Sequence, residues 1–319
     1  MELINYIFIF SISCIIFYFS GEIIVKSFNR VARFLGWKEF VVSFLLMAFV
    51  GSLPNLFVGI SSAVHSIPQL SLGEVIGGSV INVTLAIALA ALFSKNGIPA
   101  KSRTINDSLL FTSIAAILPI AFMWDGNLSR IDGILLISFF FFYIIWLFSR
   151  KDRFTKVCED EQPIQKSFSE SFKGLLKIII CLLLFAVASD LIVRSASFFA
   201  EYLDVPVMLI GLFVVALGNS APETFFAISA ARKNLEWMIL GGLMGSVVSH
   251  STLVIGIVAL INPIVITDLS PFLIARIFLF MAIFFFFIFI KTNHHISKKE
   301  AVFLLFIYIF FIISELLFN

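Results

Sequence analysis

Charged residues are scarce in this sequence. Only 13% of the 319 residues are Asp, Glu, Lys or Arg, whereas 60% are hydrophobic and 40 are phenylalanines. Soluble domains contain about 25% charged and about 45–50% apolar residues. The composition therefore excludes a soluble globular protein and predicts an integral protein of the lipid bilayer.

Several functional signals are also missing. The three cysteines, Cys14, Cys158 and Cys181, have no metal or redox spacing and are interpreted as structural thiols. There is no P-loop, nucleophile–base pair or histidine cluster at membrane depth, so we expect neither an enzyme nor a cofactor. The net charge of +2 comes from short basic clusters between apolar segments, which does not indicate a nucleic-acid partner. The N-terminus lacks the positive region of a cleaved signal, so the first apolar segment is expected to remain as an anchor.

Ten apolar segments are long enough to cross a bilayer, whose hydrocarbon core of about 30 Å requires about 20 residues per helix. They lie near residues 4–25, 39–63, 73–94, 106–124, 130–149, 174–199, 206–230, 239–261, 271–290 and 300–317. Lys and Arg concentrate in alternate connections, and such connections stay on the cytoplasmic side. The sequence predicts a multi-pass protein of the inner or plasma membrane with both termini extracytoplasmic, and it leaves the oligomeric state open.

The chain contains an internal repeat. An offset of 168 residues aligns 51–92 with 219–260 without a gap and with 15 identities, including Ser52 with Ser220 and Pro54 with Pro222. Because each half has five spans, the second half enters the membrane from the opposite side, as in inverted-topology transporters. The predicted fold is all-α, with ten transmembrane helices as two inverted five-helix repeats. The repeats occupy residues 1–149, with the motif 49–92, and 171–319, with the motif 217–260, and residues 150–170 form a cytoplasmic linker.

Each motif places a proline inside an apolar span. Pro54 and Pro222 cannot donate backbone hydrogen bonds, so they deprive the carbonyls of Val50 and Gly218 of helical partners. Such carbonyls are tolerated in a membrane only where protein or a polar cavity satisfies them, and a hard cation such as calcium accepts carbonyl oxygens as ligands. The sequence therefore predicts interrupted helices and a cation site near the bilayer midplane.

Polar side chains recur at matching positions of both motifs, three or four residues apart, so that each pair faces one side of a helix. The candidate site residues are Ser52, Asn55 and Asn82 in the first half and Ser220, Glu223, Ser246 and His250 in the second. Glu223 is the strongest candidate, because an ionisable residue in mid-membrane is costly and functional by default.

These motifs resemble a known family. "GSLPNLFVGISSAV" with "GEVIGGSVIN", and "GNSAPETFFAISAA" with "GGLMGSVVSH", are similar to the two alpha repeats of the calcium/cation antiporter superfamily, which includes the sodium/calcium exchangers. The resemblance implies alternating access and the movement of calcium against sodium or protons. It also implies that the seven polar residues line the ion sites, together with backbone oxygens near Val50 and Gly218.

The sequence departs from the family pattern where charge matters. Asn55 replaces a usual acid and His250 replaces a usual acid or asparagine, which leaves Glu223 as the remaining acid of the pattern. One carboxylate leaves a divalent ion uncompensated by several kcal/mol. Glu74 stands where the family has asparagine and is a candidate compensating ligand, or alternatively an outer charge or a partner for a polar neighbour. His250 is either a proton-coupling group, because an unperturbed histidine titrates near neutrality, or a neutral hydrogen-bonded residue.

Three activities are compatible with this pattern. The first and favoured one is exchange of calcium, as a transported cation, for sodium or protons. The second is monovalent or proton-coupled exchange by the same fold with weak or lost calcium binding. The third is a membrane scaffold without transport. The sequence leaves the coupling ion, stoichiometry and direction open.

Overall fold

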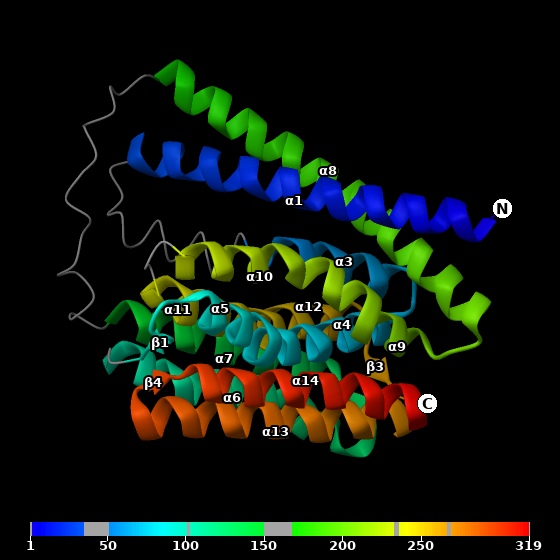
Figure 1. The fold of residues 1–319 in the computed structure, drawn as a ribbon. Helices are drawn as coiled ribbons and strands as arrows, with labels where there is room; N and C mark the ends of the chain where they lie inside the picture. Colours follow the sequence, from blue (N-terminus) through cyan, green and yellow to red (C-terminus); the bar gives the residue numbers. More distant parts are fainter. Residues whose placement is uncertain are drawn as a thin grey trace.

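The computed structural model describes residues 2–34, 51–100, 103–149, 168–232, 236–266 and 269–318, and these residues are almost entirely helical (Figure 1). Nine helices in this part of the chain are long and apolar enough to cross a membrane, and Leu53–Val64 is a shorter apolar helix. This confirms the prediction of an all-α, multi-pass membrane fold. The predicted span 39–63 is described only from residue 51 onward.

The elements keep the labels of Figure 1. The α-helices are α1 (Glu2–Phe34), α3 (Leu53–Val64), α4 (Pro68–Ile81), α5 (Ile87–Phe93), α6 (Arg103–Phe122), α7 (Arg130–Ser149), α8 (Phe168–Leu203), α9 (Val207–Ile210), α10 (Ala216–Arg232), α11 (Glu236–Val248), α12 (Ile255–Ile261), α13 (Leu269–Asn293) and α14 (Lys298–Phe318). Three π-helical turns, η2 (Asn82–Ala86), η5 (Gly211–Val215) and η6 (Ser249–Val254), join consecutive helices. A 3-10 turn, η3 (Met123–Asp125), and the strands β1 (Ile98–Pro99), β2 (Asn127–Leu128), β3 (Ile264–Val265) and β4 (His295–Ile296) complete the list.

Two helical segments form the centre of the bundle. The most apolar window of Pro68–Phe93 is 83% buried, as is that of Ile239–Ile261, whereas only 22% of the window in Glu2–Ile24 is buried. Outer helices expose large apolar side chains such as Phe8 on α1 and Phe306 on α14. Extensive apolar exposure of this kind marks a surface that meets lipid rather than water.

Helices α1 and α8 lie side by side across one side of the bundle (Figure 1). Phe185 of α8 joins them to α3, because its ring centroid lies 5.1 Å from that of Phe17 on α1 and 5.8 Å from that of Phe57 on α3. The figure also places the N- and C-termini at the same end of the molecule, as an even number of spans requires. Which side of the membrane this end faces stays a prediction.

Two short antiparallel sheets lie at opposite ends of the bundle (Figure 1). In one, Ile98 of β1 pairs with Ile296 of β4; in the other, Leu128 of β2 pairs with Ile264 of β3. The alignment of the two halves places β2 on β4, and β1 two residues from β3. Exchanging the halves therefore turns one sheet into the other at the opposite end, as expected for an inverted repeat.

Helices α7 and α14 begin with the same capping chemistry. The backbone N–H and hydroxyl of Ser129 donate to Asp132 Oδ2 at 2.9 and 2.7 Å. The same groups of Ser297 donate to Glu300 Oε2 at 2.7 and 2.8 Å. A serine followed three residues later by an acid satisfies donors that the first helical turn leaves unpaired. Since these boxes lie 168 residues apart, the repeat extends beyond the aligned motifs.

The helix interruptions differ from the prediction. Pro54 lies in the first turn of α3, where a missing N–H costs nothing. In contrast, α10 runs through Pro222 from Ala216 to Arg232, and the irregular turn is η5, which precedes it. The prediction of a break at Pro222 is therefore wrong, since a helix packed inside a bundle can lose one hydrogen bond and continue.

The π-helical turns mark equivalent places in the two halves. Turn η2 begins at Asn82, and η6 begins at Ser249 and includes His250, the residue that the repeat aligns with Asn82. Isolated π-helical turns of this kind occur frequently at functional sites. Both central helices therefore change their geometry where the sequence places a candidate ligand.

Glycines bring α4 into backbone contact with the segment before α10. A Cβ on Gly73 would lie 2.1 Å from the carbonyl oxygen of Met208, and a Cβ on Gly77 would lie 2.1 Å from that of Leu212. Only glycine permits this approach, which is the small-residue packing typical of membrane helices. This contact sets the position of α4 relative to α10, and both helices carry candidate site residues.

Candidate functional site

Glu223 lies between the two halves of the chain. Its carboxylate accepts a hydrogen bond from the Asn82 amide of the first half at 2.7 Å, through Oε2, and one from the Ser246 hydroxyl of the second half, through Oε1. Asn82 and Ser246 are buried, and the Glu223 side chain is 14% exposed. The carboxylate therefore faces the protein interior and not the lipid.

Asn55 and His250 form a second polar pair beside this carboxylate. The amide nitrogen of Asn55 lies 3.1 Å from each ring nitrogen of the buried His250. His250 Nε2 lies 3.9 Å from Glu223 Oε1. The asparagine N–H can donate only to an unprotonated ring nitrogen, so the ring nitrogen that accepts depends on the tautomer of His250. The structure thus brings a residue of α3 against η6, next to Glu223.

Ser52, Ser220 and Gly218 are further predicted positions within the described residues. Ser52 and Ser220 are buried, and the Ser220 hydroxyl oxygen lies 3.4 Å from the place of a Cβ on Gly78. Gly218 packs against α1, since a Cβ there would lie 3.0 Å from the Cys14 sulfur. Val50, whose carbonyl was the other predicted backbone ligand, lies outside the described residues.

Glu74 is fully buried but does not touch the Glu223 carboxylate. Its Oε1 accepts a hydrogen bond from the Asn219 amide on α10, one helical turn before Glu223. The observed contact matches the alternative of a partner for a polar neighbour. Asn219 is the residue that the sequence-based selection missed; its place in the motif "GNSAPETFFAISAA", four residues before Glu223, was the available signal.

The donor set around Glu223 consists of hard oxygen and amide groups. In the part of the chain that the structure describes, no three His, Cys, Asp or Glu side chains lie together as a metal-binding group. Asn82 Oδ1 is buried without a hydrogen-bond partner there. Carboxylate, hydroxyl and amide oxygens are the ligands preferred by sodium- or calcium-like cations. The arrangement can hold a hard cation against one negative charge.

Charged groups outside the centre form helix ion pairs. Lys26 Nζ lies 2.5 Å from Glu22 Oε1, and Arg194 Nε lies 2.8 Å from Asp190 Oδ2. His65 Nε2 lies 3.2 Å from Asp190 Oδ1 and connects the end of α3 to α8. These groups belong to the helix surfaces and do not contact Glu223.

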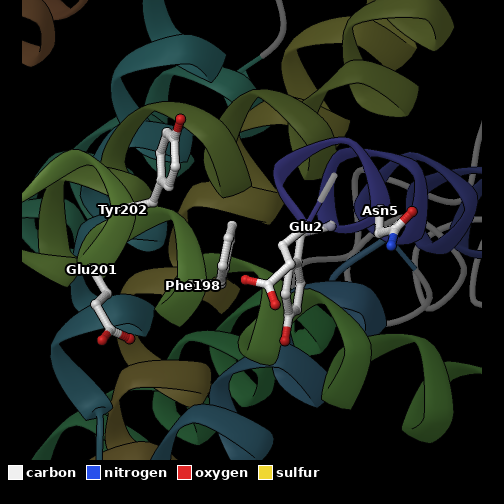
Figure 2. Close-up of a pocket in the computed structure, with 6 residues that line it drawn as sticks. Glu2, Asn5, Phe198, Glu201 and Tyr202 are labelled. Atoms are coloured by element: carbon white, nitrogen blue, oxygen red, sulfur yellow. The ribbon is translucent and has the colours of Figure 1, made fainter.

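A surface cavity lies at the N-terminal end of α1 and the C-terminal end of α8. It has a volume of about 460 Å³ and is lined by Glu2, Asn5, Tyr6, Phe198, Glu201 and Tyr202. Figure 2 shows Glu2 and Asn5 on the α1 side and Glu201 and Tyr202 on α8. None of the described candidate site residues lines it, so it is separate from the Glu223 centre.

A family model, related sequences and solved structures all match most of this chain. The family model described as sodium/calcium exchanger protein matches residues 5–149 and 173–316. An uncharacterized membrane protein of Methanocaldococcus jannaschii is 30% identical over 238 residues, which cover 74% of this chain and 76% of that protein. The sodium/calcium exchanger MaX1 of Methanosarcina acetivorans is 24% identical over 329 residues, which cover 92% of this chain and 93% of that protein. A structure of the sodium-calcium exchanger NCX_Mj, soaked with 10 mM Na⁺ and zero Ca²⁺, matches with a TM-score of 0.64 and 27% identity, over 98% of this chain and 99% of that chain.

Proposed function

This chain belongs to the sodium/calcium exchanger protein family, and we propose that it is a secondary active antiporter that exchanges calcium for sodium or protons by alternating access. Its characterised relatives are exchangers and not enzymes. The transported cations are its cargo, and the proposal requires no cofactor.

One observation carries the proposal: the Glu223 carboxylate is held by groups from both halves of an inverted repeat. A buried carboxylate is costly without a counter-charge, and an arriving cation supplies one. The unpartnered Oδ1 of Asn82 then becomes available as a further oxygen ligand. Because Asn82 and Glu223 belong to different halves, movement of one half against the other opens the site to alternate sides of the membrane.

A second candidate is exchange of monovalent cations alone. It is favoured by the Asn55–His250 pair, which puts an amide and an imidazole, rather than a second carboxylate, beside Glu223. One carboxylate balances one sodium ion but leaves a calcium ion with net positive charge in a medium of low dielectric constant. The charge of the site therefore favours a monovalent ion, whereas the names of the relatives favour calcium.

Flux in proteoliposomes tests the proposal. Radioactive calcium uptake is measured under an outward sodium or proton gradient for the wild type, for Glu223→Gln and for the control Glu201→Gln, which changes an exposed carboxylate on α8. We expect uptake in the wild type and the control and loss of uptake in Glu223→Gln. Undiminished calcium uptake by Glu223→Gln would rule out this site.

The same vesicles separate the two candidates. Sodium flux is measured in the absence of divalent cations, under sodium, potassium or proton gradients. A wild type that moves sodium but not calcium, with a sodium flux that is lost in Glu223→Gln, supports the monovalent candidate. Calcium uptake driven by sodium or protons supports the first.

A further inference from the structure

Glu74 is a buried carboxylate that the Glu223 centre does not use. Its side chain is 0% exposed, Oε1 accepts the Asn219 amide, and Oε2 has no hydrogen-bond partner among the described residues. No Lys, Arg or His in the described ranges forms an ion pair with it. An ionised carboxylate at membrane depth requires a counter-charge, so the unpartnered oxygen points to a cation.

Glu74 and Glu223 lie along one polar seam between α4 and α10. On the α4 side, positions 74, 78 and 82 follow at intervals of four and share a face. Glu74 contacts Asn219, a Cβ on Gly78 would contact the Ser220 hydroxyl, and Asn82 contacts Glu223. Asn219 and Glu223 are one turn apart on α10, about 6 Å along its axis. The seam thus carries two carboxylates, each with its own amide partner.

From this geometry we propose that Glu74 and Asn219 form a second cation site, which takes a sodium-class monovalent ion beside the Glu223 centre. One carboxylate with neutral oxygens balances a single positive charge, whereas calcium collects about 6–8 oxygens. The inference rests on the proposed function, because the bound ion is one of the coupling cations. Glu74 also supplies the second negative charge that the Glu223 centre lacks, since Asn55 occupies a position where the family pattern has an acid, and His250 one where it has an acid or asparagine.

The second site lies at one end of the seam and has no counterpart in the repeat. The alignment of the halves puts Gly242 opposite Glu74 and Gly51 opposite Asn219, so the sequence provides no matching pair in the repeat. Glu74 lies in the second turn of α4, and Gln69 at the start of α4 donates to the Val265 carbonyl of β3 at 2.8 Å. The site therefore lies toward the end of the bundle that holds β2 and β3.

Equilibrium binding of radioactive sodium to the purified full-length protein in detergent tests this proposal. We expect one sodium ion per carboxylate in the wild type. Glu74→Gln and Glu223→Gln should each lose half of the sodium bound at saturation, and the double variant should lose all of it. The control Glu201→Gln should bind as the wild type does.

The outcomes distinguish the two proposals. If Glu74→Gln binds as much sodium as the wild type while Glu223→Gln loses binding, Glu74 carries a proton or no ion, and only the second site is overturned. If Glu223→Gln binds normally while Glu74→Gln loses binding, the Glu223 centre fails and the second site stands.

A second variant guards against misfolding of Glu74→Gln. Asn219→Ala keeps the carboxylate and removes its amide partner, so we expect the second sodium ion to bind roughly tenfold more weakly, the effect of about 1.4 kcal/mol. Sodium affinity unchanged in Asn219→Ala would contradict the proposed role of Asn219. Thermal melting of each variant without sodium reports whether the fold is retained.

Discussion

The second half of the chain carries Glu223 where the first half carries Asn55, and His250 where the first half carries Asn82. The capping boxes at Ser129 and Ser297, by contrast, keep the same hydrogen bonds at the same offset. Helix starts and turns must be equivalent for both halves to fold alike. The candidate ligands meet at the interface between the halves, where one carboxylate can serve both, so their charges are free to differ.

The largest effect is expected when Glu223, the acid that distinguishes the second half from the first, is replaced. Glu223→Asn gives both halves the same amide, and we expect cation affinity and exchange to fall roughly 100-fold or more, because losing one member of a buried charged contact costs about 3–5 kcal/mol. Calcium and sodium titrations, with flux in proteoliposomes, measure this. Retained affinity would show that the asymmetry at this position has no function.

The next largest effect is expected at the glycine contact between α4 and the segment before α10. Gly77→Ala would place a Cβ 2.1 Å from the Leu212 carbonyl oxygen, and we expect a loss of about 1–3 kcal/mol in stability, as for other overpacked sites. Gly241→Ala is the matched control, since a Cβ there meets no described atom within 4 Å. Thermal melting in detergent measures both. Equal melting temperatures would contradict the close packing described for α4.

A smaller change is expected when the acid is restored to the first half. Asn55→Glu adds a carboxylate beside His250 and near Glu223, and we expect calcium to bind about tenfold more tightly relative to sodium, a gain of roughly 1.4 kcal/mol. Asn55→Gln, which keeps the amide, is the control. Competition between calcium and sodium in binding assays measures selectivity. Unchanged selectivity would mean that the residue at position 55 does not face the ion.

The smallest effects are expected at the capping boxes. Ser129→Ala and Ser297→Ala each remove a hydroxyl that bonds the acid of a first helical turn, and each should lower stability by about 1 kcal/mol. The two losses should be equal, because the two boxes have the same geometry. Clearly unequal shifts in melting temperature would show that the halves do not contribute alike.

Much of the architecture followed from the sequence. Hydropathy located the helices, because a bilayer requires long apolar segments regardless of their neighbours. The order of Ser, Pro and Gly revealed the repeat, and the motif residues identified Glu223. The helix through Pro222 could not be anticipated, since whether a proline breaks a helix depends on the packing around it.

The amino-acid sequence alone determined the membrane class, the repeat and the candidate polar residues, because hydropathy and the order of residues along the chain are sufficient to recognise them. Only the tertiary structure decided which polar groups meet: Glu223 with Asn82 across 141 residues, Glu74 with Asn219 across 145 and Asn55 with His250 across 195. These contacts depend on the axial offset and rotation of packed helices. Backbone contacts at Gly73 and Gly77 fix that offset for α4, and no local pattern encodes it.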